Sequence, residues 1–70
     1  MISYRPFWET IKEKKISTYT IINKYGISSS TINRIRHNEP LTTTTINDLC
    51  ECLDCNVEDI IMYEKSVSLV

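Results

Sequence analysis

The sequence predicts an all-α fold, a compact bundle of five short helices. Apolar residues recur at intervals of three and four in five stretches, which is the spacing that buries one face of a helix. Residues that can cap a helix (Ser, Thr or Asn) precede the last four of these stretches. The only glycine, Gly26, separates the second stretch from the third and can take the positive φ of a tight turn. We expect residues 1–70 to form one domain.

The first predicted helix begins near Pro6, which suits a first helical turn because it lacks the N–H group that a helix start leaves unpaired. Its apolar stripe consists of three side chains: Phe7, Trp8 and Ile11. We assign Trp8 to the core and expect the helix to end at Lys15. Before the helix, Met1 to Tyr4 alternates apolar and polar residues and fits a short strand.

The second and third helices are predicted over residues 18–25 and 29–37, with Ser17 and Ser28 as their caps. Each helix carries one apolar stripe, and Gly26 lets the chain turn steeply between them. Residues 17–37 therefore read as a helix-turn-helix, the unit whose second helix can lie in the major groove of DNA.

The spacing of apolar residues around the glycine is specific. Counted from Gly26, five positions are apolar: Ile21, Tyr25, Ile27, Ile32 and Ile35. In this spacing the chain resembles the Xre family of phage Cro and lambda-type repressors, over residues 6–61. The resemblance implies a lambda-repressor-like fold and regulation of transcription by DNA binding. The chain departs from the family at Ile22, where alanine is usual, and at Arg36, where glutamate is frequent.

The resemblance also implies four base-contacting residues on the third helix: Ser29, Ser30, Asn33 and Arg34. The Arg34 guanidinium matches guanine O6 and N7, and the Asn33 amide can pair with adenine, each contributing ~1–3 kcal/mol of discrimination. The two serines are short and specify little, and first-turn capping is the alternative for them. The outward residues of this helix include no acid, which favours a polyanionic partner.

Seven further residues are candidates for phosphate contacts: Thr18, Lys24, Arg36, His37, Asn38, Thr42 and Thr43. By resemblance, Thr18 takes the place of a phosphate-binding glutamine, and the loop after the third helix lies along the DNA backbone. Arg36 would add affinity without adding sequence choice. Lys24 either contacts a phosphate or only solvates the surface.

The C-terminal third predicts two more helices and a tail. Thr42 or Thr43 caps a fourth helix, and Asn56 caps a short fifth helix with Asp59 in a capping-box position. The inward residues of the fifth helix are expected to be apolar: Val57, Ile60 and Ile61. The tail, residues 62–70, is rich in strand formers such as Tyr63, Val67, Leu69 and Val70. It pairs with the N-terminal strand, pairs with a second subunit, or is disordered.

The charge is divided between the two halves of the chain. The net charge is −1, which by itself does not favour nucleic acid. Residues 1–38 hold seven Lys or Arg and two Glu, a net charge of +5, and residues 39–70 hold one Lys and seven acids, a net charge of −6. The basic half coincides with the helix-turn-helix, as a phosphate-binding face requires.

Three cysteines, Cys50, Cys52 and Cys55, invite a metal or redox interpretation. Zinc would need a fourth ligand, and His37 is the only histidine. Positions 50 and 52 are also about 200° apart on a helix and point to different faces. We therefore expect two small core residues and one partly exposed thiol at Cys52, with no metal, no cofactor and no disulfide.

Two functions of different classes remain. The first is a sequence-specific regulator, repressor-like, that binds double-stranded DNA as a homodimer. The second is a protein-interaction module of the antitoxin type, which holds a protein partner through its acidic half or tail. No motif supplies a catalytic group, so an enzyme is not expected. No apolar run reaches the roughly 20 residues of a membrane helix, and residues 1–8 lack the charged-then-apolar form of a signal peptide, so we expect a cytoplasmic protein without a membrane partner.

Overall fold

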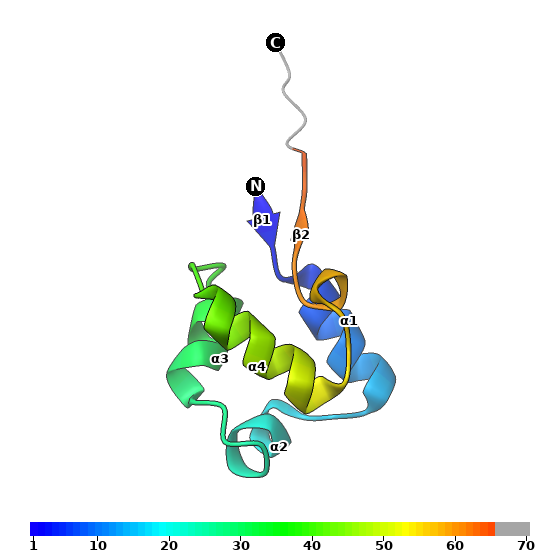
Figure 1. Cartoon of the computed structure of the whole chain (residues 1–70), viewed down its shortest axis with the longest axis vertical. Helices are drawn as coiled ribbons and strands as arrows, with labels where there is room; N and C mark the ends of the chain where they lie inside the picture. The colour runs from blue at the N-terminus through cyan, green and yellow to red at the C-terminus, as the bar shows by residue number, and fades with distance from the viewer. Residues whose placement is uncertain (66–70) are drawn as a thin grey trace.

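A computed structural model describes residues 1–65 of the chain, and its elements are mostly helical (Figure 1). In chain order they are strand β1 (Ile2–Ser3), the helices α1 (Arg5–Lys14), α2 (Thr18–Asn23), α3 (Ser29–Arg36) and α4 (Thr43–Leu53), the 3₁₀ helix η1 (Val57–Asp59) and strand β2 (Met62–Tyr63). The predicted mostly helical fold with a helix-turn-helix is confirmed, and the two terminal strands are present as well, whereas the described residues contain four α-helices and not the predicted five.

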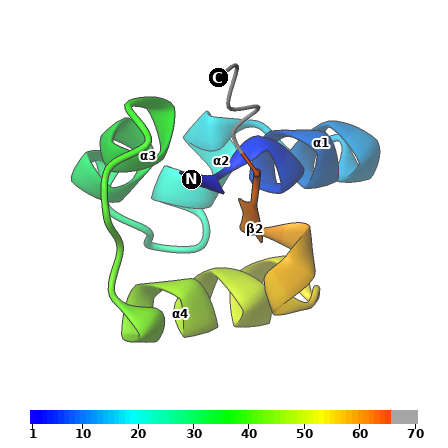
Figure 2. The same cartoon turned by 90° about the horizontal axis from the view of Figure 1, so that it is seen from above.

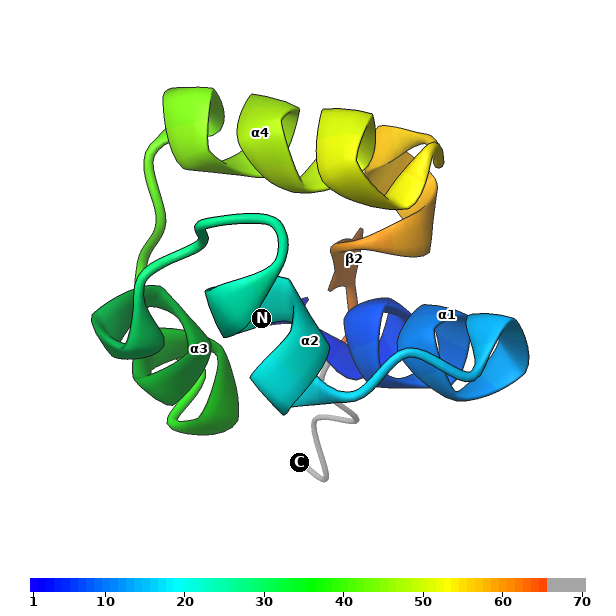
Figure 3. The same cartoon turned by 90° about the horizontal axis from the view of Figure 1, so that it is seen from below.

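The helices form two sides around one core. Seen along the long axis, α4 lies on one side and α1, α2 and α3 lie on the other (Figures 2 and 3). The core is one cluster of ten buried residues: Tyr4, Phe7, Ile11, Ile21, Ile27, Ile32, Ile35, Leu49, Leu53 and Ile60. Trp8 and Ile22 pack partly buried against this cluster. The stripes read from the sequence therefore meet as predicted, and Ile22 turns towards the apolar centre.

Hydroxyl side chains start three of the helices. Ser17, Ser28 and Thr42 each take extended backbone angles, and each side chain accepts a hydrogen bond from the backbone N–H three residues later. The donor–acceptor distances are 3.1 Å at Ser17, 3.2 Å at Ser28 and 3.2 Å at Thr42. These caps satisfy N–H groups that a helix start leaves free, and they fix the N-termini of α2, α3 and α4 where the sequence placed them.

Three helices, α1, α3 and α4, end at residues other than glycine that have left-handed backbone angles. Lys15 (φ 58°), Asn38 (φ 56°) and Asp54 (φ 51°) follow α1, α3 and α4. After each of them the next N–H closes a bond five residues back, as from Glu39 N to Arg34 O at 2.8 Å. This is the Schellman arrangement, for which Gly is usual and Asn is acceptable. Lys15 thus ends the first helix as expected.

The two terminal strands pair antiparallel, with Ile2 opposite Tyr63 and Ser3 opposite Met62. Of the alternatives for the tail, pairing with the N-terminal strand is confirmed for Met62 and Tyr63. The remaining tail predictions, at Val67, Leu69 and Val70, lie outside the described residues. An ion pair of 2.8 Å between Arg5 and Glu64 joins the strand pair to α1.

The fifth helix is shorter than predicted. Asp59 accepts a hydrogen bond of 3.0 Å from the N–H of Asn56, so the capping box forms, but only the 3₁₀ turn η1 follows. The chain has to enter β2 two residues after Ile60, and the carbonyl of Asp59 is bound by the Thr10 hydroxyl at 2.8 Å. Ile60 is fully buried as predicted, whereas the inward placement of Val57 was wrong, because its side chain is 53% exposed. Among residues 1–65, no helix has the length and apolarity that a membrane span needs.

Candidate nucleic-acid interface

The turn before α3 orients that helix. Gly26 has φ 75°, a left-handed conformation that side chains with a Cβ rarely adopt. Directly after it, Ile27 is buried and its N–H donates to the carbonyl of Ile21 at 3.2 Å. The chain is thereby anchored to α2 immediately before the Ser28 cap, so α3 begins at a fixed place and angle.

One face of α3 is buried and the other is open to solvent. Ile32 and Ile35 are 1% and 2% exposed, and they turn the rest of the helix outward. The outward side chains are all polar or basic: Ser29, Ser30, Asn33, Arg34 and Arg36. The structure therefore brings the four predicted base-contacting residues to one exposed helical surface, and that surface holds no carboxylate.

The two serines of this surface differ in their local bonding. Capping belongs to Ser28, whose hydroxyl also lies 3.1 Å from that of Ser30 and 2.9 Å from that of Thr31. Ser30 is thus partly committed to the cap network. The side chain of Ser29 makes no hydrogen bond within residues 1–65 and faces solvent.

The loop after α3 is tied to the N-terminal segment. The Asn38 side-chain amide donates to the carbonyl of Ile2 at 2.8 Å, and the Tyr4 hydroxyl donates to the carbonyl of Glu39 at 2.6 Å. Tyr4 is 5% exposed, and this burial raises the pKa of its phenol. His37 Nδ1 lies 2.9 Å from the Asn33 carbonyl, which places the ring beside the last turn of α3. The loop predicted to follow DNA is therefore held in one shape.

Three of the predicted phosphate-contacting residues, Thr18, Thr42 and Thr43, lie at the starts of helices, and they differ in whether the hydroxyl is used as a cap. Thr42 uses its hydroxyl to cap α4, whereas Thr43, the first residue of α4, is exposed. The first N–H groups of an 11-residue helix lie next to Thr43. Thr18, the first residue of α2, is only half-buried and follows the Ser17 cap.

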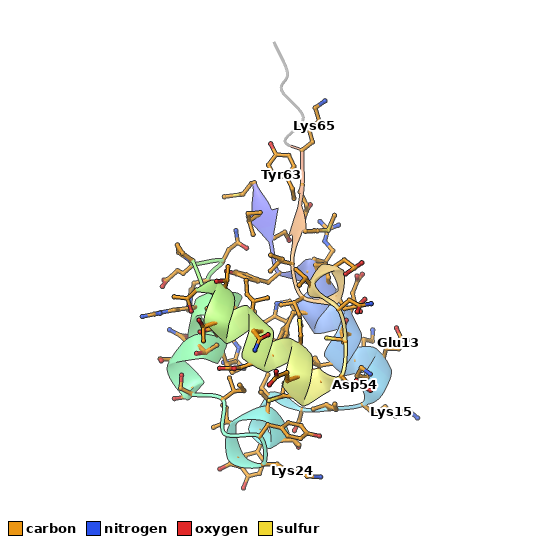
Figure 4. All side chains as sticks on the ribbon, viewed as in Figure 1. Glu13, Lys15, Lys24, Asp54, Tyr63 and Lys65 are labelled. Atoms are coloured by element: carbon orange, nitrogen blue, oxygen red, sulfur yellow. The ribbon has the colours of Figure 1, made fainter. Side chains whose placement is uncertain are left out.

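The lysines of the basic half do not gather at α3. Lys24 lies at the end of the molecule opposite the strand pair, and Lys15 lies at the far end of α1 (Figure 4). The Lys24 Nζ is 5.8 Å from the ring centre of Tyr25, its own neighbour. The first half of the sequence is basic, but in the folded structure its cations are spread over several surfaces. Among the cations of residues 1–65, Arg34 and Arg36 are those that lie on α3 itself.

Arg36 is placed by an aromatic ring that sequence reasoning assigned to the core alone. Its guanidinium carbon lies 6.0 Å from the ring centre of Trp8, a cation–π distance. Trp8 in turn meets Phe7 edge to face at 5.0 Å. This stack joins the last turn of α3 to α1. Neither it nor the Tyr4 bond to Glu39 has a local sequence signal, because each joins segments about 30 residues apart.

The three cysteines lie at and after the end of α4 and are all partly buried. Burial raises the pKa of the Cys55 thiol to about 11, with smaller contributions from Cys50 and Asp59. Burial and the neighbouring Asp48 and Glu51 raise the pKa of Cys52. Thiols that stay protonated are poor nucleophiles and metal ligands. Within the described part of the chain, no group of three potential ligands is placed to hold a metal ion.

Comparisons with known proteins point the same way as the geometry. The family model described as the Cro/C1-type HTH DNA-binding domain matches residues 7–66. The crystal structure of the transcriptional regulator VanUg, Form II, is similar to this structure, with a TM-score of 0.79 and 28% sequence identity over 87% of this chain and 81% of that chain. No curated protein sequence matches the chain.

Proposed function

Because the chain belongs to the family of Cro/C1-type helix-turn-helix DNA-binding domains, we propose that it is a transcriptional regulator that inserts α3 into the major groove of double-stranded DNA. The similarity to the transcriptional regulator VanUg supports the regulatory part of this proposal. We propose a repressor-like action, in which occupation of the site by the protein blocks transcription.

The observation that carries the proposal is the outward face of α3. Two buried isoleucines fix which side of the helix faces solvent, and that side offers hydrogen-bonding groups and two arginines without a carboxylate. We assign Arg34 and Asn33 to base edges, because their planar groups can each make paired hydrogen bonds. Ser29 and Ser30 contact the same groove with a shorter reach.

Phosphate contacts on either side would hold α3 in register. We assign them to Thr18, Lys24, Arg36, His37, Asn38, Thr42 and Thr43 and to the free N–H groups at the start of α4. Asn38 and Thr42 are engaged within the protein, so we expect them to act mainly by ordering the backbone of this loop. The ring of Trp8 holds Arg36 at the edge of the surface.

The first experiment selects bound duplexes from a random pool and then measures affinity for the selected site as a function of salt. The proposal predicts an enriched sequence and a steep, linear fall of log affinity with log salt, because bound phosphates release counterions. A failure to enrich any sequence, together with undetectable duplex binding at low salt, would contradict it.

A matched pair of variants tests the assignment of α3. Arg34→Ala is expected to cost ~1–3 kcal/mol on the selected site and to relax the preference at one base pair. Arg36→Ala, on the same helix, is expected to weaken all duplexes alike and to lower the salt slope by about one. Equal losses for both variants on every duplex would remove Arg34 from base readout.

The alternative function is a module that binds a protein partner through its acidic half. The observation that favours it is the exposed surface of α4, where Asp48 and Glu51 occur and no Lys or Arg does. Such a module can retain DNA binding, so the two functions are compatible. As the sole function, it predicts little or no binding to any duplex, and the salt titration separates the two.

A further inference from the structure

The single histidine of the chain stands at the C-terminal end of α3, with one ring nitrogen bonded and the other free. Nδ1 of His37 lies 2.9 Å from the backbone carbonyl oxygen of Asn33. A carbonyl oxygen only accepts hydrogen bonds, so Nδ1 is the donor of this bond and carries a proton. The other nitrogen, Nε2, has no hydrogen-bond partner within residues 1–65, and the side chain is exposed to solvent.

The bond to Asn33 determines what Nε2 can offer to a ligand. A neutral imidazole carries one proton, and with that proton on Nδ1 the outer nitrogen Nε2 is an acceptor only. The opposite tautomer would leave two acceptors, Nδ1 and the Asn33 carbonyl oxygen, facing each other at 2.9 Å. A second proton converts the ring to an imidazolium, in which both nitrogens donate and the bond to Asn33 is kept. Nε2 is therefore an acceptor on the neutral ring and a donor on the charged one.

The protein itself pairs no carboxylate with this ring. The segments at this end of the molecule are residues 29–41, residues 1–9, which contact the loop after α3, and residues 62–65, which pair with β1. Besides His37, their ionisable groups are Arg34, Arg36, Glu39, the Met1 ammonium group, Tyr4, Arg5, Glu9, Tyr63, Glu64 and Lys65. Glu64 pairs with Arg5 at 2.8 Å, and within residues 1–65 no carboxylate forms an ion pair with the imidazole. A phosphate at Nε2 would thus be its first anionic partner.

We propose that His37 contacts a DNA phosphate only in its protonated form, so that DNA binding through this residue takes up one proton from the solvent. A phosphate oxygen is an acceptor, and the neutral ring would turn a second acceptor, the lone pair of Nε2, towards it. The imidazolium instead donates a charge-assisted hydrogen bond from the same atom. This inference rests on the proposed DNA binding and adds to it a dependence on pH.

The direction of the pH dependence follows from linkage. An imidazole changes its charge between about pH 5 and pH 8. Because the phosphate binds the protonated ring, the complex holds this proton more tightly than the free protein does. The affinity for DNA is therefore highest on the acid side of the range and falls as the pH rises through it. One charge-assisted hydrogen bond corresponds to a change in affinity of about tenfold.

Fluorescence anisotropy of the selected duplex at about pH 5.5 and about pH 8.5, each at several salt concentrations, tests the proposal. The unmodified protein should bind about tenfold more tightly at the lower pH, and its salt slope there should be steeper by about 0.9, since one more phosphate is neutralised. His37→Asn is the control, because its amide can still donate to the Asn33 carbonyl but does not titrate. Its affinity and salt slope should be the same at both pH values and close to those of the unmodified protein at about pH 8.5. A pH dependence that persists in His37→Asn would overturn the proposal.

Two further measurements address the proton directly. Calorimetric titration with the duplex at about pH 7, in two buffers with different heats of ionisation, counts the protons that binding takes up. The unmodified protein should take up as much as one proton more than His37→Asn, and equal uptake by the two proteins would overturn the proposal. In the free protein at about pH 8.5, ¹⁵N NMR of the imidazole should show the proton on Nδ1, and a proton on Nε2 would remove the premise. If the unmodified protein binds its selected duplex equally well at both pH values, the proton linkage is wrong while the proposed function stands. If it binds no duplex at either pH at low salt, the proposed function itself fails.

Discussion

Helices α3 and α4 are built alike and differ in the charge that they show to solvent. Each begins at a hydroxyl cap, Ser28 or Thr42, and each ends at a left-handed residue, Asn38 or Asp54. Each buries a stripe of branched side chains in the same core. On their outward faces, however, α3 carries two arginines and no acid, whereas α4 carries two acids and no base. They lie on different sides of the molecule (Figure 2).

The comparison separates the residues that determine folding from the residues available for binding. The buried stripes and the caps do the same work in both helices, since they bury apolar surface and pair the first N–H groups. The outward side chains are not needed for either purpose, so their charge reflects what each helix contacts. The following variants test this separation.

The largest effect is expected in the buried stripes. Ile32→Ala in α3 and Leu49→Ala in α4 each remove a side chain that is at most 1% exposed. Each should lower the free energy of unfolding by ~2–5 kcal/mol, measured by urea titration. Tyr19→Ala, at a side chain that is 74% exposed, is the control and should change it by less than about 0.5 kcal/mol. A much smaller loss at one of the two helices would show that they do not share one core.

The next effect concerns the outward charges. Arg34→Glu in α3 should weaken binding to the selected duplex by more than tenfold, a loss of at least about 1.4 kcal/mol, because it removes a base contact and repels phosphates. Glu51→Lys in α4 makes the opposite change on the other side of the molecule and should not weaken binding. Fluorescence anisotropy of a labelled duplex measures both. Tighter binding by Glu51→Lys would mean that α4 also lies near the DNA phosphates, and a loss as large as that of Arg34→Glu would contradict the assignment of DNA binding to α3.

The caps should contribute equally. Ser28→Ala and Thr42→Ala each remove one acceptor from a backbone N–H, and each should cost about 1 kcal/mol of stability. Thermal unfolding should then show similar decreases in Tm for the two variants. Ser29→Ala, which removes a hydroxyl without such a bond, should leave Tm nearly unchanged. A strong decrease in Tm for Ser29→Ala would show that Ser29, and not Ser28, caps α3.

The smallest effect is expected at the left-handed ends, and here the two helices should differ. Asp54→Gly removes the steric strain of a side chain at φ 51° and also raises the conformational entropy of the unfolded chain. The first effect is the larger, so the free energy of unfolding should rise by about 0.5 kcal/mol. Asn38→Gly relieves the same strain but also removes the bond to Ile2, a contribution of about 1 kcal/mol, so it should not stabilise. Denaturant unfolding of both variants distinguishes the outcomes. Stabilisation by Asn38→Gly would mean that the hydrogen bond from Asn38 to Ile2 does not contribute to the free energy of unfolding.

Local patterns were sufficient to predict most of the fold. The caps at Ser17, Ser28 and Thr42, the turn at Gly26 and the buried stripes depend on residues a few positions apart, and such patterns are readable from one sequence. The fifth helix was overestimated for a non-local reason. Its length depends on where β2 pairs with β1, and that pairing joins residues about 60 positions apart.

The site divides in the same way. Helical periodicity alone turned Asn33 and Arg34 outward, because Ile32 and Ile35 had to face inward. The partners that fix the surroundings of α3 were not predictable, since Tyr4 reaches Glu39 and Trp8 reaches Arg36 only in the folded chain. The charge pattern gave the division of charge along the chain but not its distribution over the surface, because Lys15, at the far end of α1, lies away from α3.

The turn needs glycine at position 26 for its left-handed backbone conformation and not for lack of space. A Cβ at this position would meet no atom within 4 Å, so only the positive φ of 75° excludes an ordinary side chain. A residue of mirror-image configuration prefers that half of conformational space. Total chemical synthesis with D-alanine in place of Gly26 should therefore keep the turn while it lowers the conformational entropy of the unfolded chain, and the folded state should be more stable.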